Sequence, residues 1–230
     1  MLFVELSLLL SSILTLCCCQ YVHTPTQIKS FFEREEIIPD VLIYGPEKKL
    51  KVKYGDEKCN FGTAYSASEV KEPPKVKWEH EPGAYYTLIM IDPDVPNKKT
   101  PILREYQHWL VVNIPENRPT EGQTLTEYLG VVPEQTKCIH RYILLVYKQP
   151  GKKPIDFDLM YKDKTPNNST RGKFHTQNFA EAYKLGNVTF GNFFLSGMVL
   201  DPRYDDNMDE EYRKIGAKID LTKPSDDDDF

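Results

Sequence analysis

The 230-residue sequence predicts one mostly β domain with helices at its periphery. Tyrosine and phenylalanine, which favour strands, occur 14 and 11 times. Apolar residues form many short runs that 12 glycines and 17 prolines interrupt, as in β-rich folds with long loops. The composition, 40% apolar and 27% charged, lies in the globular range and supplies a sizeable core. No internal repeat and no glycine–serine linker divides the chain.

The first 19 residues are typical of a signal peptide. Met1–Leu16 is an apolar block that is too short for a membrane span of about 20 residues and has the length of a secretory hydrophobic segment. Small cysteine side chains precede Gln20, so cleavage before this residue is expected. The segment lacks the usual lysine or arginine and carries Glu5, which leaves a membrane anchor as the alternative. We therefore expect a secreted protein.

The mature chain is interpreted as one domain over residues 20–217, followed by an acidic tail over residues 218–230. The tail contains Asp226–Asp229, which is most simply a solvated end. Residues 205–217 are mostly charged with apolar side chains at spacings of three and four, which predicts a surface helix.

A helix is expected near the start of this domain. Thr24–Gln27 combines a cap residue, a first-turn proline and a glutamine three residues on, which predicts a helix that continues to Glu36. Pro39 should stop it. The side chains expected to face the core are Ile28, Phe31 and Phe32.

Strands follow. Apolar and lysine residues alternate over 50–54, which predicts a strand with one wet face. Residues 85–91 form a continuous β-branched and aromatic run, as expected for a central strand covered on both sides. Residues 106–114 and 139–147 form similar runs of β-branched and aromatic residues and predict two further strands of this kind. Between them, Thr124–Glu127 has the pattern of a capping box and predicts a short helical turn.

The last elements of the domain are a helix and a strand. Residues 174–185 carry Phe179, Ala182 and Tyr183 at helical spacing, and Gly186 is the expected left-handed stop. Residues 188–195 predict one more strand.

The loop Asp92–Pro96 is the first candidate for chemistry. It follows the central strand directly, and its two prolines restrict the backbone. Two carboxylates on a stiff loop at a strand end could face a cavity. The alternative is that Asp92 or Asp94 only bonds local backbone N–H groups.

Two histidines in the neighbouring strands complete the candidate site. Strand alternation places Tyr106 beside His108, with Gln107 and Trp109 on the opposite face, and places His140 beside Tyr142. If these residues converge with Asp92 at the strand ends, they form a small polar site within an apolar pocket. Each histidine could instead be a core residue with its own partner.

Cysteines and glycosylation motifs agree with export. Removal of the leader leaves Cys59 and Cys138, which either form one disulfide or remain two buried thiols. Three Asn-x-Ser/Thr motifs begin at Asn167, Asn168 and Asn187. The first two lie in a polar loop and are the more persuasive glycosylation sites.

Four segments together carry a family resemblance: Asp92–Pro96, Arg104–Ile114, His140–Tyr142 and Arg171–Phe174. In this order they resemble the successive signatures of the phosphatidylethanolamine-binding protein family, which includes Raf kinase inhibitor protein and the plant flowering-time regulators. The resemblance extends from about Thr24 to about Phe194 and identifies the chain as a secreted member. It implies a large antiparallel β-sheet packed on a smaller one, with flanking helices and an anion pocket near the sheet edge.

The resemblance also implies the residues of that pocket. The expected ligand-binding residues are Asp92, His108, His140 and Tyr142, with Pro96 and Pro133 at the rim and Tyr106 beside His108. Arg104 and Glu105 belong to the same motif, where a structural salt-bridge role is expected. The chain departs from the family pattern at Gln107, at Cys138 and after Phe194.

The expected function is non-catalytic binding of phosphate-containing head groups, such as phosphatidylethanolamine-like lipids, or of related small anions. A protonated histidine would favour such anions, so affinity should fall from about pH 6 to about pH 8. A protease inhibitor or signalling modulator that acts through protein contacts is the alternative. A monomer without a cofactor is expected, and a net charge of -5 argues against nucleic acid as a partner. An enzyme with a histidine base, or a zinc site at His108, His140 and Asp92, is less favoured, because a phosphate-binding pocket explains the same residues with fewer assumptions.

Overall fold

The computed structural model describes residues 22–131 and 138–197. The expected signal peptide, the expected helix over residues 205–217, the acidic tail and Pro133 lie outside the described residues. None of the helices within the described ranges is long and apolar enough to cross a membrane.

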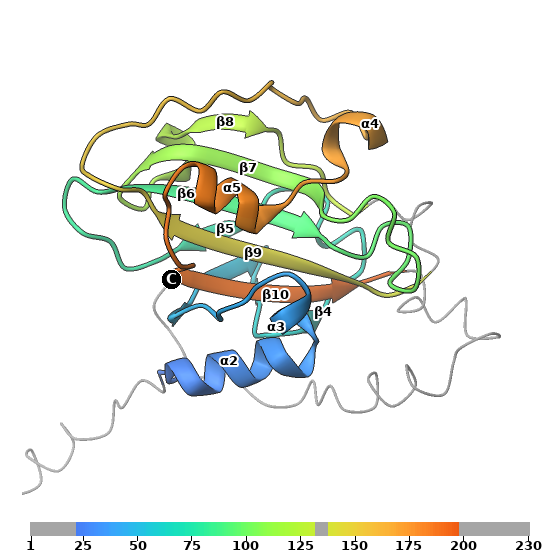
Figure 1. The fold of residues 1–230 in the computed structure, drawn as a ribbon. Helices are drawn as coiled ribbons and strands as arrows, with labels where there is room; N and C mark the ends of the chain where they lie inside the picture. The colour runs from blue at the N-terminus through green and yellow to red at the C-terminus, as the bar shows by residue number, and fades with distance from the viewer. Residues whose placement is uncertain (1–21, 132–137, 198–230) are drawn as a thin grey trace, which may run out of the picture.

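A large sheet forms the centre of the domain (Figure 1). Its main path runs in the order β1 (Lys48–Lys49), β10 (Phe190–Ser196), β9 (His140–Lys148), β6 (Tyr85–Asp92), β7 (Tyr106–Pro115) and β8 (Gln123–Thr126), and β4 (Thr63–Ala64) also pairs with β10. The neighbours from β10 to β8 are antiparallel, whereas β1 and β4 run parallel to β10. The large sheet is therefore mixed, although its central strands are antiparallel as expected.

A smaller antiparallel sheet packs on one face of the large sheet. It has the order β3 (Glu57–Lys58), β2 (Lys51–Tyr54) and β5 (Lys75–Lys77). Val52 and Tyr54 of β2 contribute to one apolar cluster with Leu88, Leu144 and Phe194 of the large sheet. The prediction of a large sheet on a smaller one, with a half-buried strand over 50–54, is confirmed.

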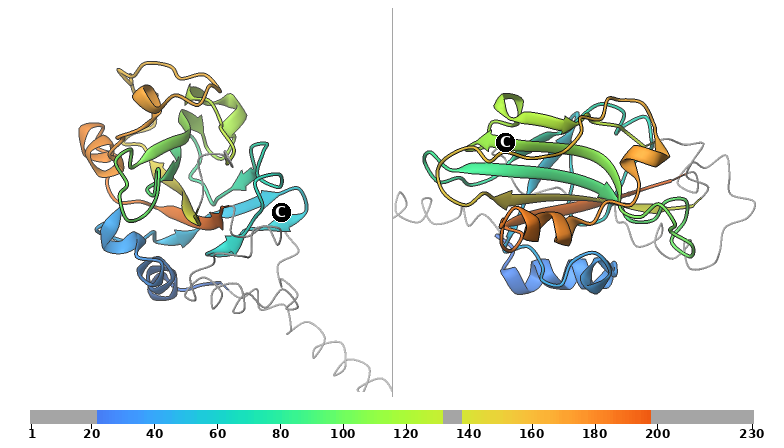
Figure 2. Two further views of the ribbon diagram at one scale, coloured as in Figure 1. Left: turned by 90° about the vertical axis from the view of Figure 1, so that its right-hand side faces the viewer. Right: turned by 45° about the horizontal axis from the view of Figure 1, so that its top comes forward.

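Helices cover the opposite face of the large sheet. Helix α2 (Pro25–Arg34), helix α3 (Ile37–Asp40) and helix α5 (Thr176–Ala182) lie on this side, and Figure 2 shows helices, large sheet and small sheet as successive layers. The remaining helical segments are η1 (Pro119–Glu121) and α4 (Asn168–Arg171). A second core contains Phe32, Ile143 and Phe179, so the large sheet is buried on both faces.

The first helix begins as predicted and ends earlier. The Thr24 hydroxyl accepts the Gln27 N–H, and the Gln27 side chain accepts the Thr24 N–H, which is a complete capping box. The helix ends at Arg34 rather than Glu36, because Glu36 takes a left-handed conformation with φ 55°. Pro39 lies inside α3 and does not follow the first helix directly.

The predicted helical turn at Thr124–Glu127 is wrong. The segment forms β8, whose residues pair with β7. The backbone of Lys162 also bonds the carbonyl of Leu125 and the N–H of Glu127. Partners on both sides satisfy the backbone of this segment, which overrides its local preference for a turn.

Candidate functional site

Four neighbouring strands of the large sheet each have one terminus at the same end of the sheet, which we call the strand-end edge. Because β6, β7, β9 and β10 are antiparallel neighbours, the ends of β6 and β10 lie beside the starts of β7 and β9. The register pairs Asp92 with Tyr106 and Ser196 with His140. This topology brings Asp92, Tyr106 and His140, three of the residues that the sequence proposed, to the same end of the sheet.

A β-bulge places His108 over the site. In the pairing of β6 with β7, Met90 faces Trp109 and Ile91 faces Gln107, so His108 is an extra residue. The His108 ring lies 5.1 Å from the Tyr142 ring, edge to face. Trp109 packs on the same side of the sheet, 5.6 Å from Tyr128. The predicted alternation, which put Trp109 on the opposite face, is wrong because the bulge shifts the pattern by one residue.

Asp92 and His140 form the centre of the site. His140 Nδ1 lies 2.7 Å from Asp92 Oδ2, and both side chains are buried. Burial lowers the pKa of His140, but the hydrogen bond and charge of Asp92, supported by Cys138, outweigh it and raise the pKa to about 10. His140 is therefore an imidazolium at neutral pH. The other carboxylate oxygen of Asp92 accepts the backbone N–H of Asp94 at 2.7 Å, which fixes its orientation.

His108 is held differently. Its Nδ1 lies 2.7 Å from the carbonyl oxygen of Leu129, so Nδ1 carries the proton. Burial lowers the pKa of His108 despite the opposing charge of Asp92. The two histidines therefore differ in charge at neutral pH, one cationic and one neutral.

Two tyrosines complete the apolar wall of the site. The Tyr142 ring stacks on Phe194 with centroids 4.9 Å apart and an interplanar angle of 9°. Burial and the Asp92 and Asp94 carboxylates raise the pKa of Tyr142 well above its usual value, so its hydroxyl stays protonated. The buried Tyr106 ring lies 5.4 Å from His108.

Three polar atoms on residues at this edge are buried without a hydrogen-bond partner in the described part of the chain. They are Tyr106 Oη, His140 Nε2 and Ser196 Oγ, the last two on residues paired across β9 and β10. An unsatisfied buried polar group costs about 1–3 kcal/mol, so two on paired residues indicate a place for a polar ligand or water. Ser196 belongs to no motif in the sequence, and the pairing of its strand end with His140 identifies it.

Asp94 has a structural role. Its carboxylate accepts two hydrogen bonds from the Arg141 guanidinium, at 2.9 and 2.6 Å, and a third from the Arg141 backbone N–H. Arg141 also contacts Asp40 at 2.8 Å and the carbonyl oxygens of Glu35 and Glu36. This buried arginine ties the loop after β6 to the amino-terminal helices.

Three other residues of the family motifs also make contacts that support the fold. Arg104 pairs with Asp40 at 2.8 Å, as expected of a salt bridge, whereas buried Glu105 accepts the backbone N–H of Thr176 at the start of α5. Arg171 is buried and donates to backbone carbonyls, among them that of Gln107 at 2.8 Å. Pro96 is exposed at the end of its loop.

The two cysteines are not joined, so the structure has the free thiols and not the disulfide among the two alternatives that the sequence left open. Both are free thiols. Cys59 is buried in the core, where Sγ lies 3.2 Å from the carbonyl oxygen of Phe193, and burial raises its pKa to about 12. Cys138 is half-buried, and its side chain helps to raise the pKa of His140.

Two further predictions from the sequence concern glycosylation and a metal site. Asn167 and Asn187 are exposed, and Asn168 lies at the start of α4. Within the described ranges, no three histidine, cysteine or acidic side chains gather closely enough to hold a metal ion.

Comparison with known proteins finds relatives over most of the chain. The family model described as "Phosphatidylethanolamine-binding protein" matches residues 44–194. A Drosophila melanogaster protein named odorant-binding protein A5 is 33% identical over 182 residues, 79% of this chain and 85% of that protein. The 26 kDa secreted antigen of Toxocara canis is 34% identical over 163 residues, 70% of this chain and 60% of the antigen.

Solved structures share the fold. Carboxypeptidase Y inhibitor, crystallised with its cognate proteinase, has a TM-score of 0.65 at 20% identity, covering 78% of this chain and 98% of the inhibitor. Phosphatidylethanolamine-binding protein from Plasmodium vivax has a TM-score of 0.60 at 20% identity, covering 76% of this chain and 98% of that protein.

Proposed function

Since the chain belongs to the phosphatidylethanolamine-binding protein family, we propose that it is a secreted, non-catalytic monomer that binds phosphate-containing head groups or related small anions. The family match and relatives named as binding or antigen proteins support binding rather than catalysis. The apolar amino terminus and a relative named as a secreted antigen support secretion.

The observation that carries the proposal is the buried Nε2 of a cationic His140, for which residues 22–131 and 138–197 supply no hydrogen-bond partner. Asp92 holds the opposite ring nitrogen at 2.7 Å, which fixes the ring and keeps it charged. Nε2–H can then donate a charge-assisted hydrogen bond to a phosphate oxygen. Ser196 Oγ supplies a further donor at the same edge, whereas the Tyr142 hydroxyl, which stays protonated, is hydrogen-bonded to Asp92 and lines the site.

Calorimetric titration with phosphorylethanolamine tests this proposal. The variant His140→Gln should weaken binding about tenfold or more, because a hydrogen bond to a charged group is lost. His80→Gln is the matched control, since His80 is partly exposed and pairs with Glu116 beyond the opposite end of β7. Equal affinity of wild type and a folded His140→Gln variant would contradict the proposal.

The alternative function is protease inhibition. It rests on the fold shared with carboxypeptidase Y inhibitor, and 20% identity supports the fold alone. Inhibition of carboxypeptidase Y by the purified chain at micromolar concentration would favour this alternative, and the His140→Gln variant would show whether the strand-end site takes part.

A further inference from the structure

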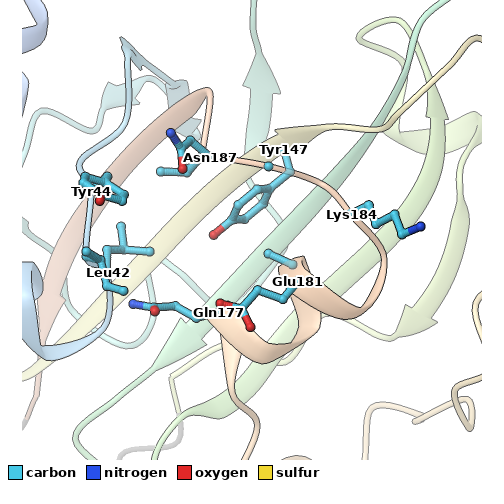
Figure 3. A pocket seen from close by; sticks show the side chains of 11 residues that line it. Leu42, Tyr44, Tyr147, Gln177, Glu181, Lys184 and Asn187 are labelled. Carbon is cyan, nitrogen blue, oxygen red and sulfur yellow. The ribbon is translucent and has the colours of Figure 1, made fainter.

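A separate pocket of about 480 Å³ lies on the helix-covered side of the large sheet (Figure 3). It is bounded by α5, by the segment after α3, by Tyr147 of β9 and by the turn before β10. Leu42, Ala180 and Val188 form its apolar lining. The strand-end site contacts the core on the opposite face of the sheet, so this pocket is a distinct feature.

The pocket combines aromatic and polar side chains in a way that suits a sugar. Tyr44 is 65% exposed at one wall, and Tyr147 lies deeper. Gln177, Glu181 and Lys184 of the α5 region supply polar groups at the rim. Sugar rings present C–H faces, which pack on aromatic rings, and hydroxyl groups, which bond polar side chains.

Asn187, the first residue of an Asn-Val-Thr glycosylation motif, is itself part of the lining. It is exposed, and it follows Gly186, whose φ of 73° turns the chain out of α5. Thr189, the third residue of the motif, is fixed by backbone hydrogen bonds to Val146 at 3.0 Å and to Lys48 at 2.9 Å. Asn187 is thus held at the rim, on the side of Tyr44 (Figure 3).

We propose that Asn187 carries an N-linked glycan and that the first sugars of this glycan occupy the pocket against Tyr44 and Tyr147. The amide nitrogen of Asn187 forms a bond to the anomeric carbon of the oligosaccharide, while the bond from that carbon to the phosphate oxygen of a polyprenyl-diphosphate sugar donor breaks. Polyprenyl diphosphate is the leaving group, and the amide proton passes to solvent. A glycan tethered to the pocket wall has a high effective concentration there, which favours it over any free ligand.

The glycan would also cover exposed apolar surface. Ile43 and Tyr44 are 60% and 65% exposed and are adjacent in sequence at the pocket wall. Sugars over these side chains would reduce their contact with water and with other proteins. This reverses the preference drawn from sequence, which ranked the polar loop at Asn167 and Asn168 above Asn187.

The first test maps the glycans on full-length protein secreted from eukaryotic cells. Digestion with peptide N-glycosidase should convert Asn187 to aspartate, and the Asn187→Gln and Thr189→Ala variants should each lose one glycan by mass. Thr189→Ser, which preserves the motif, should keep it. Secreted protein without a glycan at Asn187 overturns this inference alone, whereas retention inside the cell without any glycan also contradicts the proposed secretion on which it depends.

The second test asks whether the sugars lie in the pocket. In the Asn187→Gln variant, amide exchange in residues 41–45 should accelerate severalfold, and the fluorescence of 8-anilinonaphthalene-1-sulfonate should rise. The double variant Asn167→Gln/Asn168→Gln is the control and should change neither readout. Unchanged exchange and fluorescence in Asn187→Gln would show a glycan directed away from the pocket and would overturn the proposal.

Discussion

At the scale of single residues, the candidate site contains two histidines whose pKa values are shifted in opposite directions. Both are buried, yet Asp92 contacts only His140 directly, and this hydrogen bond raises the pKa of His140 to about 10. Without such a partner, burial lowers the pKa of His108. The sequence predicted that histidines and a carboxylate would converge, but it could not predict which histidine Asp92 would contact.

The charge of His140 changes the expected pH dependence of ligand binding. Since this imidazolium persists well above neutral pH and His108 stays neutral, phosphorylethanolamine affinity should be nearly constant from about pH 7 to about pH 8.5. This replaces the fall around the ordinary imidazole pKa that the sequence alone suggested. Calorimetry across this range checks it, and a tenfold fall would show that a histidine with an ordinary pKa is the donor.

The same pair should make stability depend on pH. The pKa of His140 is raised in the folded state, so its stabilising contribution is complete below the unfolded value of about 6.5 and is lost as the pH rises toward 10. Urea unfolding should show the largest difference between wild type and His140→Gln near pH 6. The difference should shrink steadily up to pH 10. A constant difference would contradict the charged pair.

Ser196 separates ligand contact from structural support. Its buried hydroxyl has no partner in the described part of the chain, so Ser196→Ala should leave the midpoint of thermal unfolding unchanged or slightly raised. The same variant should weaken phosphorylethanolamine binding severalfold if the hydroxyl contacts the ligand. Thermal unfolding and calorimetry on one sample distinguish these effects, and unchanged affinity would remove Ser196 from the site.

The free thiols give a test at the same scale. In the native protein, iodoacetamide should modify half-buried Cys138 and spare Cys59, which is 1% exposed with a pKa raised to about 12. Peptide mass spectrometry after brief labelling reads out both positions. A peptide pair joined through these two cysteines would instead show the disulfide, the other alternative that the sequence left open.

At the scale of elements, strands were more predictable than their irregularities. The apolar runs over 85–91 and 106–114 correspond to β6 and β7, because buried central strands need continuous apolar sequence. The bulge at His108 has no such signal, since it arises from the pairing of β7 with β6. The capping-box pattern at Thr124–Glu127 likewise gave way to strand pairing that no local pattern encodes.

The loop after β6 owes its position to Arg141 as well as to its prolines. Asp94→Asn should destabilise the protein by about 3 kcal/mol, because it leaves a buried guanidinium with one charged partner fewer. Arg118→Gln, which removes the surface ion pairs of Arg118 with Glu116 and Glu121, is the control and should change stability little. Chemical denaturation measures both, and equal effects would show that the Arg141 network is not a principal support of the fold.

At the scale of the whole molecule, the large sheet separates the two proposed sites. On one face, the strand-end site lies where the core shared with the small sheet meets the edge of the large sheet. On the other face, helices enclose the pocket that contains Asn187. The layered fold could be predicted from the apolar runs of the strands and from the family resemblance. The pocket could not be predicted, because residues distant in sequence line it.

The most direct test of the central claim is nitrogen NMR of the His140 ring in the full chain, with and without phosphorylethanolamine. We expect both ring nitrogens to carry protons at pH 8 and the Nε2 resonance to shift when the ligand is added. A neutral ring at pH 8, or an Nε2 resonance that ignores saturating ligand, would contradict an anion site built on His140.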